Sequence, residues 1–180
     1  TLNCKMKSFP MKFPILLVLL AFLGLSACNN ETQTTTVTLD PMAFEWSGPL
    51  LEGSNPAQVT VTVDPKVLLG DLWKEGVEIK RVVLKKAEVN AENNEDFAGI
   101  LSLVMSMASN NPELRMQEIA AASPLQPEYN KASLNMAPQA HLDDFFKEKE
   151  FYMVLDASLQ SDREQDLRLT GQVTFEITYR

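Results

Sequence analysis

The sequence predicts an all-β fold, an antiparallel β-sandwich with one or two short helices. Apolar residues recur with a period of two along most of the chain, which is the spacing of half-buried strands, and turn signals separate these segments. The connections between them are also too short for the helices of ten or more residues that parallel crossovers need. Such a pattern favours about seven or eight strands over an α/β arrangement.

The composition is that of a globular protein. The chain has 180 residues, of which 45% are hydrophobic and 22% are charged, which excludes a disordered or multi-span membrane protein. Its 24 acidic and 16 basic side chains give a net charge of -8. Because nucleic-acid binding needs clustered Lys and Arg to neutralise phosphates, we expect no nucleic-acid partner.

The first predicted elements lie in the N-terminal half. Residues 58–63 alternate valine with polar residues until Asp64 and Pro65 end the strand, and a short helical turn is expected over residues 66–73. The next strand covers residues 79–89. Its adjacent apolar residues Val82 and Val83 predict a bulge or burial on both faces.

A third strand follows at residues 101–107, and one face of it is expected to carry Leu101, Leu103, Met105 and Met107. Weaker candidates are residues 114–119 and 133–136. A second helical turn is expected over residues 142–147. Its neighbouring phenylalanines, Phe145 and Phe146, could plug one end of a sandwich.

The C-terminal segments have the cleanest alternation. In residues 151–159 and again in residues 167–180, apolar and polar side chains alternate almost without interruption. The polar stretch between them, residues 162–166, is expected to be their hairpin loop. The order of these elements resembles small secreted β-sandwich domains with immunoglobulin-like or related topology, an analogy that carries no function.

The N-terminus has the features of an export signal. A basic stretch containing Lys5, Lys7 and Lys12 precedes 13 apolar residues at 13–25, a length that suits a signal peptide and is short for a membrane span. Residues 1–10 are expected to be upstream sequence, because Met6 and Met11 are plausible starts.

Directly after the apolar run come Leu25, Ser26, Ala27 and Cys28, then Asn29 and further polar residues. Here the chain resembles bacterial lipoproteins with a type II signal peptide. The resemblance implies that a signal peptidase recognises Leu25, Ser26 and Ala27, and that it cleaves before Cys28. It further implies that the Cys28 thiol carries the lipid, a palmitate-type acyl anchor, which suits the strong nucleophilicity of a thiolate.

The resemblance also implies a location. In enterobacterial lipoproteins an aspartate after the lipidated cysteine retains the protein in the inner membrane, so Asn29 predicts the outer membrane, with the domain facing the periplasm or the cell surface. The expected parts are residues 1–27 as upstream sequence and signal peptide, residues 28–36 as lipidated cysteine and flexible tether, and residues 37–180 as a single β-sandwich domain.

Residues 28–180 hold 13 basic and 24 acidic side chains, a net charge of −11. Since this charge opposes adsorption to anionic lipid, membrane attachment is expected to be covalent.

No constellation of residues predicts catalysis. His141 is the only histidine, and although Asp143 and Asp144 follow it, no glycine-flanked nucleophilic serine accompanies them. Zinc would need more Cys and His ligands than the chain has. The 24 acidic residues show no spacing that singles out a glycosidase pair. We therefore expect no enzyme and no cofactor.

Three features of the sequence could bind a metal ion or a partner. The acidic residues 92–96 and 162–166 could bind calcium, but they lack the glycine-containing loop of an EF-hand. The six methionines downstream of Cys28 could bind copper(I), yet their inward strand positions favour core packing. Trp46, beside the turn at residues 47–49, is a candidate partner contact, with core or edge covering as the favoured alternative.

Two function classes remain. The first is a non-catalytic binding or assembly module, held at the cell envelope by its lipid anchor, that presents a loop or an edge strand to an envelope protein or glycan. The alternative is a periplasmic carrier of an apolar ligand such as a lipid. A closed sandwich favours the first, whereas a barrel with several hundred cubic ångströms of void favours the second.

Overall fold

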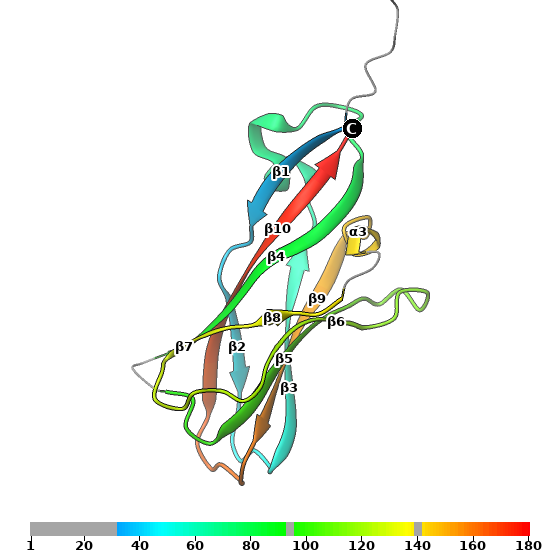
Figure 1. Ribbon diagram of the computed structural model, residues 1–180. Helices are drawn as coiled ribbons and strands as arrows, with labels where there is room; N and C mark the ends of the chain where they lie inside the picture. Colours follow the sequence, from blue (N-terminus) through cyan, green and yellow to red (C-terminus); the bar gives the residue numbers. More distant parts are fainter. Residues whose placement is uncertain (1–31, 93–95, 139–141) are drawn as a thin grey trace, which may run out of the picture. The chain divides into compact units, whose positions relative to one another are not determined.

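The computed structural model describes residues 32–92, 96–138 and 142–180. Most of these residues are in antiparallel strands (Figure 1). The strands are β1 (Gln33–Thr38), β2 (Met42–Trp46), β3 (Gly53–Thr62), β4 (Ile79–Ala91), β5 (Ile100–Ala108), β6 (Gln117–Ala122), β7 (Lys131–Ser133), β8 (Asn135–Met136), β9 (Glu150–Leu159) and β10 (Leu167–Tyr179). The helices are α2 (Pro65–Leu69), α3 (Leu142–Phe145) and the 3₁₀ turn η1 (Gly70–Leu72).

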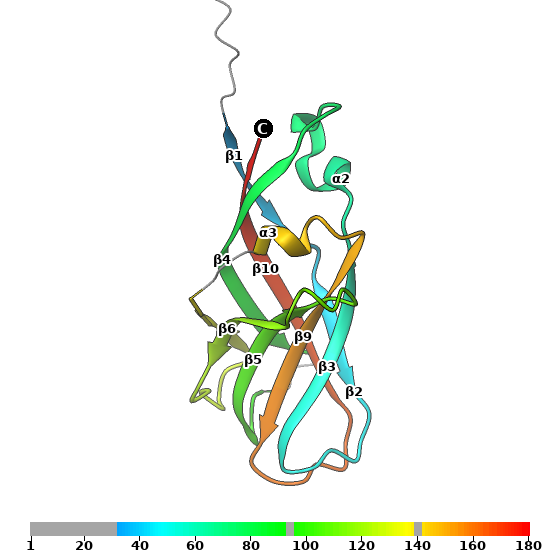
Figure 2. The ribbon, with the colours of Figure 1, turned by 90° about the vertical axis from the view of Figure 1, so that its right-hand side faces the viewer.

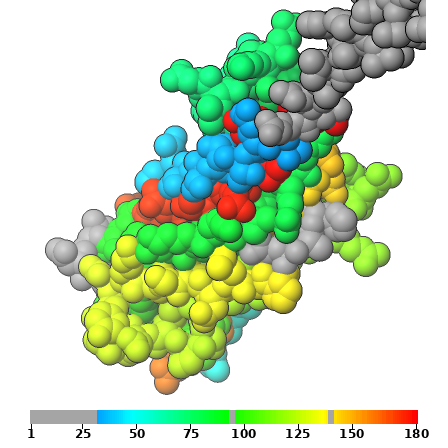
Figure 3. All heavy atoms as spheres, turned by 45° about the horizontal axis from the view of Figure 1, so that its top comes forward, coloured from blue at the N-terminus to red at the C-terminus, as the bar shows by residue number. Residues whose placement is uncertain are grey.

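The strands form two five-stranded sheets, which confirms the predicted all-β sandwich with short helices. In the first sheet the order is β1, β10, β4 and β7, and β2 pairs with the other half of the β10 edge that β1 occupies. The outer face of this sheet shows β1, β10, β4 and β7 side by side (Figure 3). The second sheet has the order β3, β9, β5, β6 and β8.

Most connections cross from one sheet to the other. Only β5 and β6 are consecutive strands that pair as a hairpin in the described residues. If β1 and β2 are taken as one bent strand, this interleaved order is that of a jelly roll, a double-sheet fold built from two Greek keys. The sandwich is thus of the related kind rather than immunoglobulin-like in its strand order.

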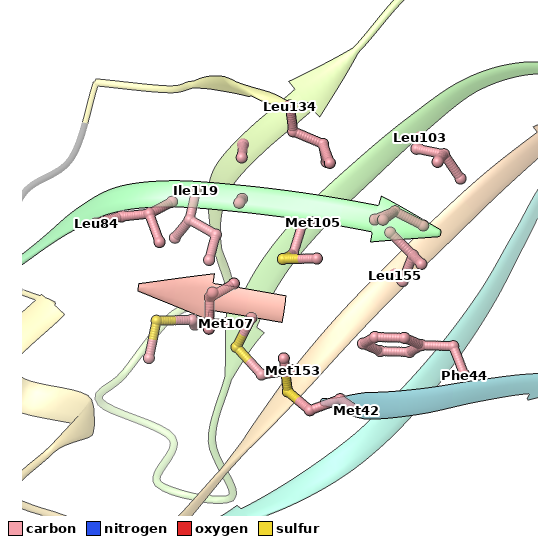
Figure 4. Close-up of a cluster of buried hydrophobic side chains, with 14 of the residues drawn as sticks. Met42, Phe44, Leu84, Leu103, Met105, Met107, Ile119, Leu134, Met153 and Leu155 are labelled. Atoms are coloured by element: carbon pink, nitrogen blue, oxygen red, sulfur yellow. The ribbon is translucent and has the colours of Figure 1, made fainter. Parts of the chain in front are cut away.

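The alternation of the sequence accounts for the core. In β10 the apolar residues expected to face inward are all buried, and β9 shows the same pattern. Side chains from both sheets meet between them, and Met42, Met105, Met107 and Met153 come together beside Phe44 (Figure 4). Flexible methionines fill the irregular space between the sheets.

One end of the core is closed by α3, as predicted for Phe145 and Phe146. The Phe146 ring lies 5.2 Å from the Phe151 ring of the second sheet and 5.2 Å from the Phe175 ring of the first. Figure 2 shows α3 beside β4 and β9. The helix therefore ties the two sheets together.

The prediction that residues 162–166 form a hairpin loop between two paired strands is wrong. β9 and β10 belong to different sheets, so this segment crosses between them. It is held by paired backbone hydrogen bonds between Arg163 and Leu50, of 2.8 and 2.9 Å. Both flanking strands alternate equally well, and alternation identifies an inner face without saying which strand is the neighbour.

The tether was also predicted too long. Residues 33–36, expected to be flexible, are the first part of β1 and pair with Glu176–Tyr179 of β10. A threonine-rich segment has too few apolar side chains to indicate a strand, but its threonines suit the polar outer face of an edge strand.

Register slips in two strands shift the expected inward positions. In β4 the register slips opposite Thr174/Phe175 and Thr178/Tyr179, which puts the bulges at the paired basic residues around Lys80 and Lys85 and not at Val82 and Val83. In β5 a slip between Ile100 and Ser102 turns Leu101 outward, where it is 49% exposed. Met116 and Met136 are exposed too, against the expectation of inward methionines.

Candidate functional site

Several residues singled out by the sequence lie outside the described residues. These are Leu25, Ser26, Ala27 and Cys28 of the lipoprotein signal, His141, and residues 93–95 of the first acidic run. Among the described residues no helix has the length and apolar character needed to span a bilayer.

Trp46 belongs to the core, the alternative that the sequence favours over a partner contact. It is the last residue of β2. Its side chain is only 5% exposed, and its ring centroid lies 6.4 Å from that of Phe44. The indole Nε1–H donates to the Asn55 carbonyl oxygen of β3 at 2.8 Å. A buried tryptophan needs such an acceptor, so the residue holds β2 and β3 together.

The acidic loop at residues 162–166 has a structural role. Asp162 accepts a hydrogen bond from the Glu52 backbone N–H at 2.8 Å, and Asp166 accepts one from Gly48 at 3.0 Å. These carboxylates fasten the loop that contains Leu50. In the described part of the chain, acidic, histidine and cysteine side chains form no group of three that could hold a metal ion.

A groove of about 570 Å³ lies at one edge of the sandwich and is here called the edge slot. Its volume is in the range of ordinary ligand pockets. One wall is the bend from β1 into β2, the other is the free edge of β3, and α2 lies at one end. The lining residues are Val37, Thr38, Leu39, Asp40, Pro41, Met42, Ala43, Val59, Thr60, Val61, Thr62, Asp64, Val67 and Leu68.

The edge slot exists because the two sheets close at only one end of this edge. Trp46 joins β2 to β3 at the closed end. Toward the other end β1 and β3 diverge, and α2 follows β3 there (Figure 2). The helix begins where Pro65 follows Asp64, whose carboxylate caps it by accepting the Lys66 N–H at 2.8 Å.

The apolar residues of the slot are only partly covered. Val37, Leu39, Val59 and Val61 pack against the core but stay half-buried, and Val67 is 78% exposed. By contrast, the inward side chains of β9 and β10, the strands that pair with β3 and β1, are buried. The slot therefore exposes part of the inner faces of both sheets.

β3 is an edge strand, and beyond Pro56 it lacks the features that usually protect one. In the described residues it pairs with β9 alone. Pro56 removes a backbone donor near its start, but residues 57–62, which read AQVTVT, contain no proline and no charged residue. A strand edge of this kind is a ready template for pairing with another chain.

The charge in the slot is negative. Asp40 and Asp64 are exposed there, and among the described lining residues there is no lysine or arginine. The arrangement offers apolar contacts, unpaired strand edges and two carboxylates.

Sequence reasoning missed this site. The alternation predicts a strand at residues 58–63, and the lack of charge in residues 57–62 is the available signal for an unprotected edge. Its partner wall could not be found, because residues 33–36 were assigned to the tether and the bend between β1 and β2 was not predicted.

Comparison with known proteins adds little. No protein family matches the sequence, and no curated protein matches it. Among solved structures the chain is similar to one titled "Crystal structure of decameric BFDV Capsid Protein", with 12% sequence identity and a TM-score of 0.46. The match covers 83% of this chain and 100% of that chain.

Proposed function

We propose that this chain is a lipid-anchored protein of the bacterial cell envelope that acts as a non-catalytic binding module, with the edge slot as its binding site. The slot of about 570 Å³, lined by half-buried valines and by unpaired strand edges, is the observation that carries the binding role. The segment from Leu25 to Cys28 supports the anchor.

The short segment between Cys28 and β1 bears on where an anchored domain would lie. β1 starts at Gln33, five residues after Cys28, and an extended chain of five residues spans at most about 18 Å. A lipid on Cys28 would therefore hold the domain close to the membrane surface, in the reach of partners that are themselves membrane-bound.

The anchor is tested by labelling with palmitate and by detergent partitioning. We expect the wild-type chain to take up label and to enter the detergent phase, and Cys28→Ala to lose both. Cys4→Ala is the matched control, because Cys4 lies upstream of the apolar run and should be dispensable. Continued labelling of Cys28→Ala would refute the anchor.

Placement in the outer membrane, facing the periplasm or the cell surface, is part of the proposal and depends on Asn29. Density-gradient fractionation should find the wild type in the outer membrane and Asn29→Asp in the inner membrane. A wild type found wholly in the inner membrane would contradict this placement.

The alternative is a carrier of an apolar ligand such as a lipid, which the volume and the apolar lining of the slot favour. Phospholipid that stays bound to the wild type through purification, and is lost when Val61 is replaced by lysine, would support the carrier.

A further inference from the structure

We propose that the ligand of the edge slot is an extended polypeptide segment that pairs with the free edge of β3 as an additional strand. This inference rests on the proposed function, because it takes the slot as the binding site and names the class of ligand that fits it.

Backbone borders the slot on both walls. Side chains of a strand alternate between its two faces, so a wall made by one face would contribute every second residue. Here the lining residues are consecutive, from Val59 to Thr62 on one wall and from Val37 to Ala43 on the other. The slot therefore lies against the edges of the strands.

The backbone groups at the free edge of β3 favour a polypeptide over an acyl chain as the ligand. An acyl chain would cover the unpaired N–H and C=O groups of β3 without replacing their hydrogen bonds to water, which costs free energy. A polypeptide strand pairs with these groups as it covers them, which is the mode of strand addition to a sheet edge. Residues 57–62 form an uncharged edge long enough for this pairing.

The half-buried side chains on the two walls of the slot also favour an added strand. Val59 and Val61 lie on the inner face of β3 and pack against the core, and Val37 and Leu39 do so from the opposite wall. A strand added beside β3 would place every second side chain on this inner face, level with the valines. An alternating apolar segment would thus complete the sandwich.

The negative charge of the slot favours a positively charged ligand. Asp40 and Asp64 are exposed in the slot, and no lysine or arginine is among the described residues that line it. Complementarity favours lysine or arginine among the outward residues of the segment. A second copy of this chain fits less well, because pairing β3 with β3 would bring its own Asp40 and Asp64 to the same interface.

The test uses the full chain in detergent as bait for a library of displayed random decapeptides. We expect enriched peptides to alternate apolar residues and to carry lysine or arginine. The best binder is then made with N-methyl groups at alternate residues, in each of the two frames. Methylation in the frame that faces β3 should weaken binding about tenfold or more, and methylation in the other frame should not.

A second readout follows the protein. Hydrogen exchange with and without the peptide should show slower exchange at alternate amides of residues 57–62. Equal affinities for the two methylated peptides, or unchanged exchange along β3, would overturn strand pairing.

Protein variants separate this inference from the proposed function. Val61→Lys should abolish peptide binding, while Gln58→Lys, on the exposed face of the same strand and outside the slot, should not. Peptides that bind Val61→Lys as tightly as the wild type would refute the slot as the binding site. Binding that Val61→Lys abolishes but N-methylation leaves unchanged would overturn only the paired strand.

Two other occupants give distinct signals. Native mass spectrometry that finds phospholipid on the wild type and none on Val61→Lys would identify an apolar ligand and contradict the proposal. Sedimentation that finds a dimer, dissociated by Val61→Lys, would identify a second copy and contradict it as well.

Discussion

Gly171 occupies an inward position of β10 where a side chain has no room. A Cβ atom there would lie 2.8 Å from Cε2 of Phe44 and 3.3 Å from Cε of Met105. Phe44 is fully buried, so its ring cannot easily move aside. The glycine allows a phenylalanine from β2 to pack directly against the β10 backbone.

We therefore expect Gly171→Ala to destabilise the protein by about 1–3 kcal/mol, the usual cost of overpacking a core. The neighbour Gln172, on the outer face, supplies the control Gln172→Ala, which should shift the urea midpoint little. Equal midpoints for Gly171→Ala and the wild type would mean that Phe44 lies elsewhere.

Phe175 is the second residue on which the core depends. Its ring is fully buried and contacts Phe146, the residue that directly follows α3. We expect Phe175→Ala to cost about 3–5 kcal/mol of the free energy of unfolding, because it leaves a cavity where α3 joins the sheets. Thr174→Ala removes an exposed hydroxyl, 3.0 Å from the Thr38 hydroxyl, and should cost less than about 0.5 kcal/mol.

Urea midpoints of the two variants decide this. Similar shifts for Phe175→Ala and Thr174→Ala would show that the two faces of β10 have been exchanged, since a register slip of one residue has that effect.

Single residues were predicted best where one face of a strand is fully buried. The inward set of β10 followed from alternation alone, because every second residue meets the opposite sheet. Trp46 could not be assigned from sequence, since the partner that satisfies its N–H is a backbone carbonyl of β3. Leu101 was placed on the wrong face because a bulge leaves no mark in the alternation.

At the scale of elements, an ion pair of Glu88 links β4 to β7 in addition to their backbone pairing. The Glu88 carboxylate forms ion pairs with the Lys86 ammonium at 2.9 Å and with that of Lys131 of β7 at 3.1 Å. Only 11% of the Glu88 side chain is exposed. The hydrogen bond from Lys86 lowers the pKa of Glu88 most, burial opposes it, and Lys131 lowers it further.

Because the pKa of Glu88 is lower in the folded state than in the unfolded state, its stabilisation is present above the ordinary pKa of a glutamate. This stabilisation is lost as the pH falls through the lowered value. The melting temperature of Glu88→Gln should therefore fall less steeply than that of the wild type as the pH is lowered. An acid decline identical to that of the wild type would show that Glu88 has no such role.

The start of β1 gives a prediction that separates a strand from a tether. Residues 33–36 pair with β10, so alternate amides among them should exchange slowly with deuterium. Hydrogen-exchange mass spectrometry of the anchored protein measures this directly. Complete exchange of the segment at the earliest time point would restore the longer flexible tether.

Elements were predictable where apolar residues alternate and were missed where threonine replaces them. β3, β9 and β10 were expected from valine, leucine and phenylalanine, whereas β1 consists mostly of threonine and glutamine. Its structure is a consequence of the β10 edge on which it pairs. Long-range pairing of this kind lies between residues more than a hundred positions apart and has no local signal.

For the whole molecule, the sandwich class followed from the sequence, while the jelly-roll order did not. The order depends on which strands share a sheet, and both sheets present the same alternation. The edge slot is a property of this order, because β1, β2 and β3 meet at one edge only after the chain has crossed between the sheets.

The proposed function requires that the protein hold a partner in the edge slot. The most direct measurement places a photo-cross-linking amino acid at position 61 or, as the control, at position 58, in full-length protein made in living cells. We predict a discrete adduct from position 61 that disappears when Val59→Lys is added, and none from position 58. No adduct from position 61, or equal adducts from both positions, would contradict the account.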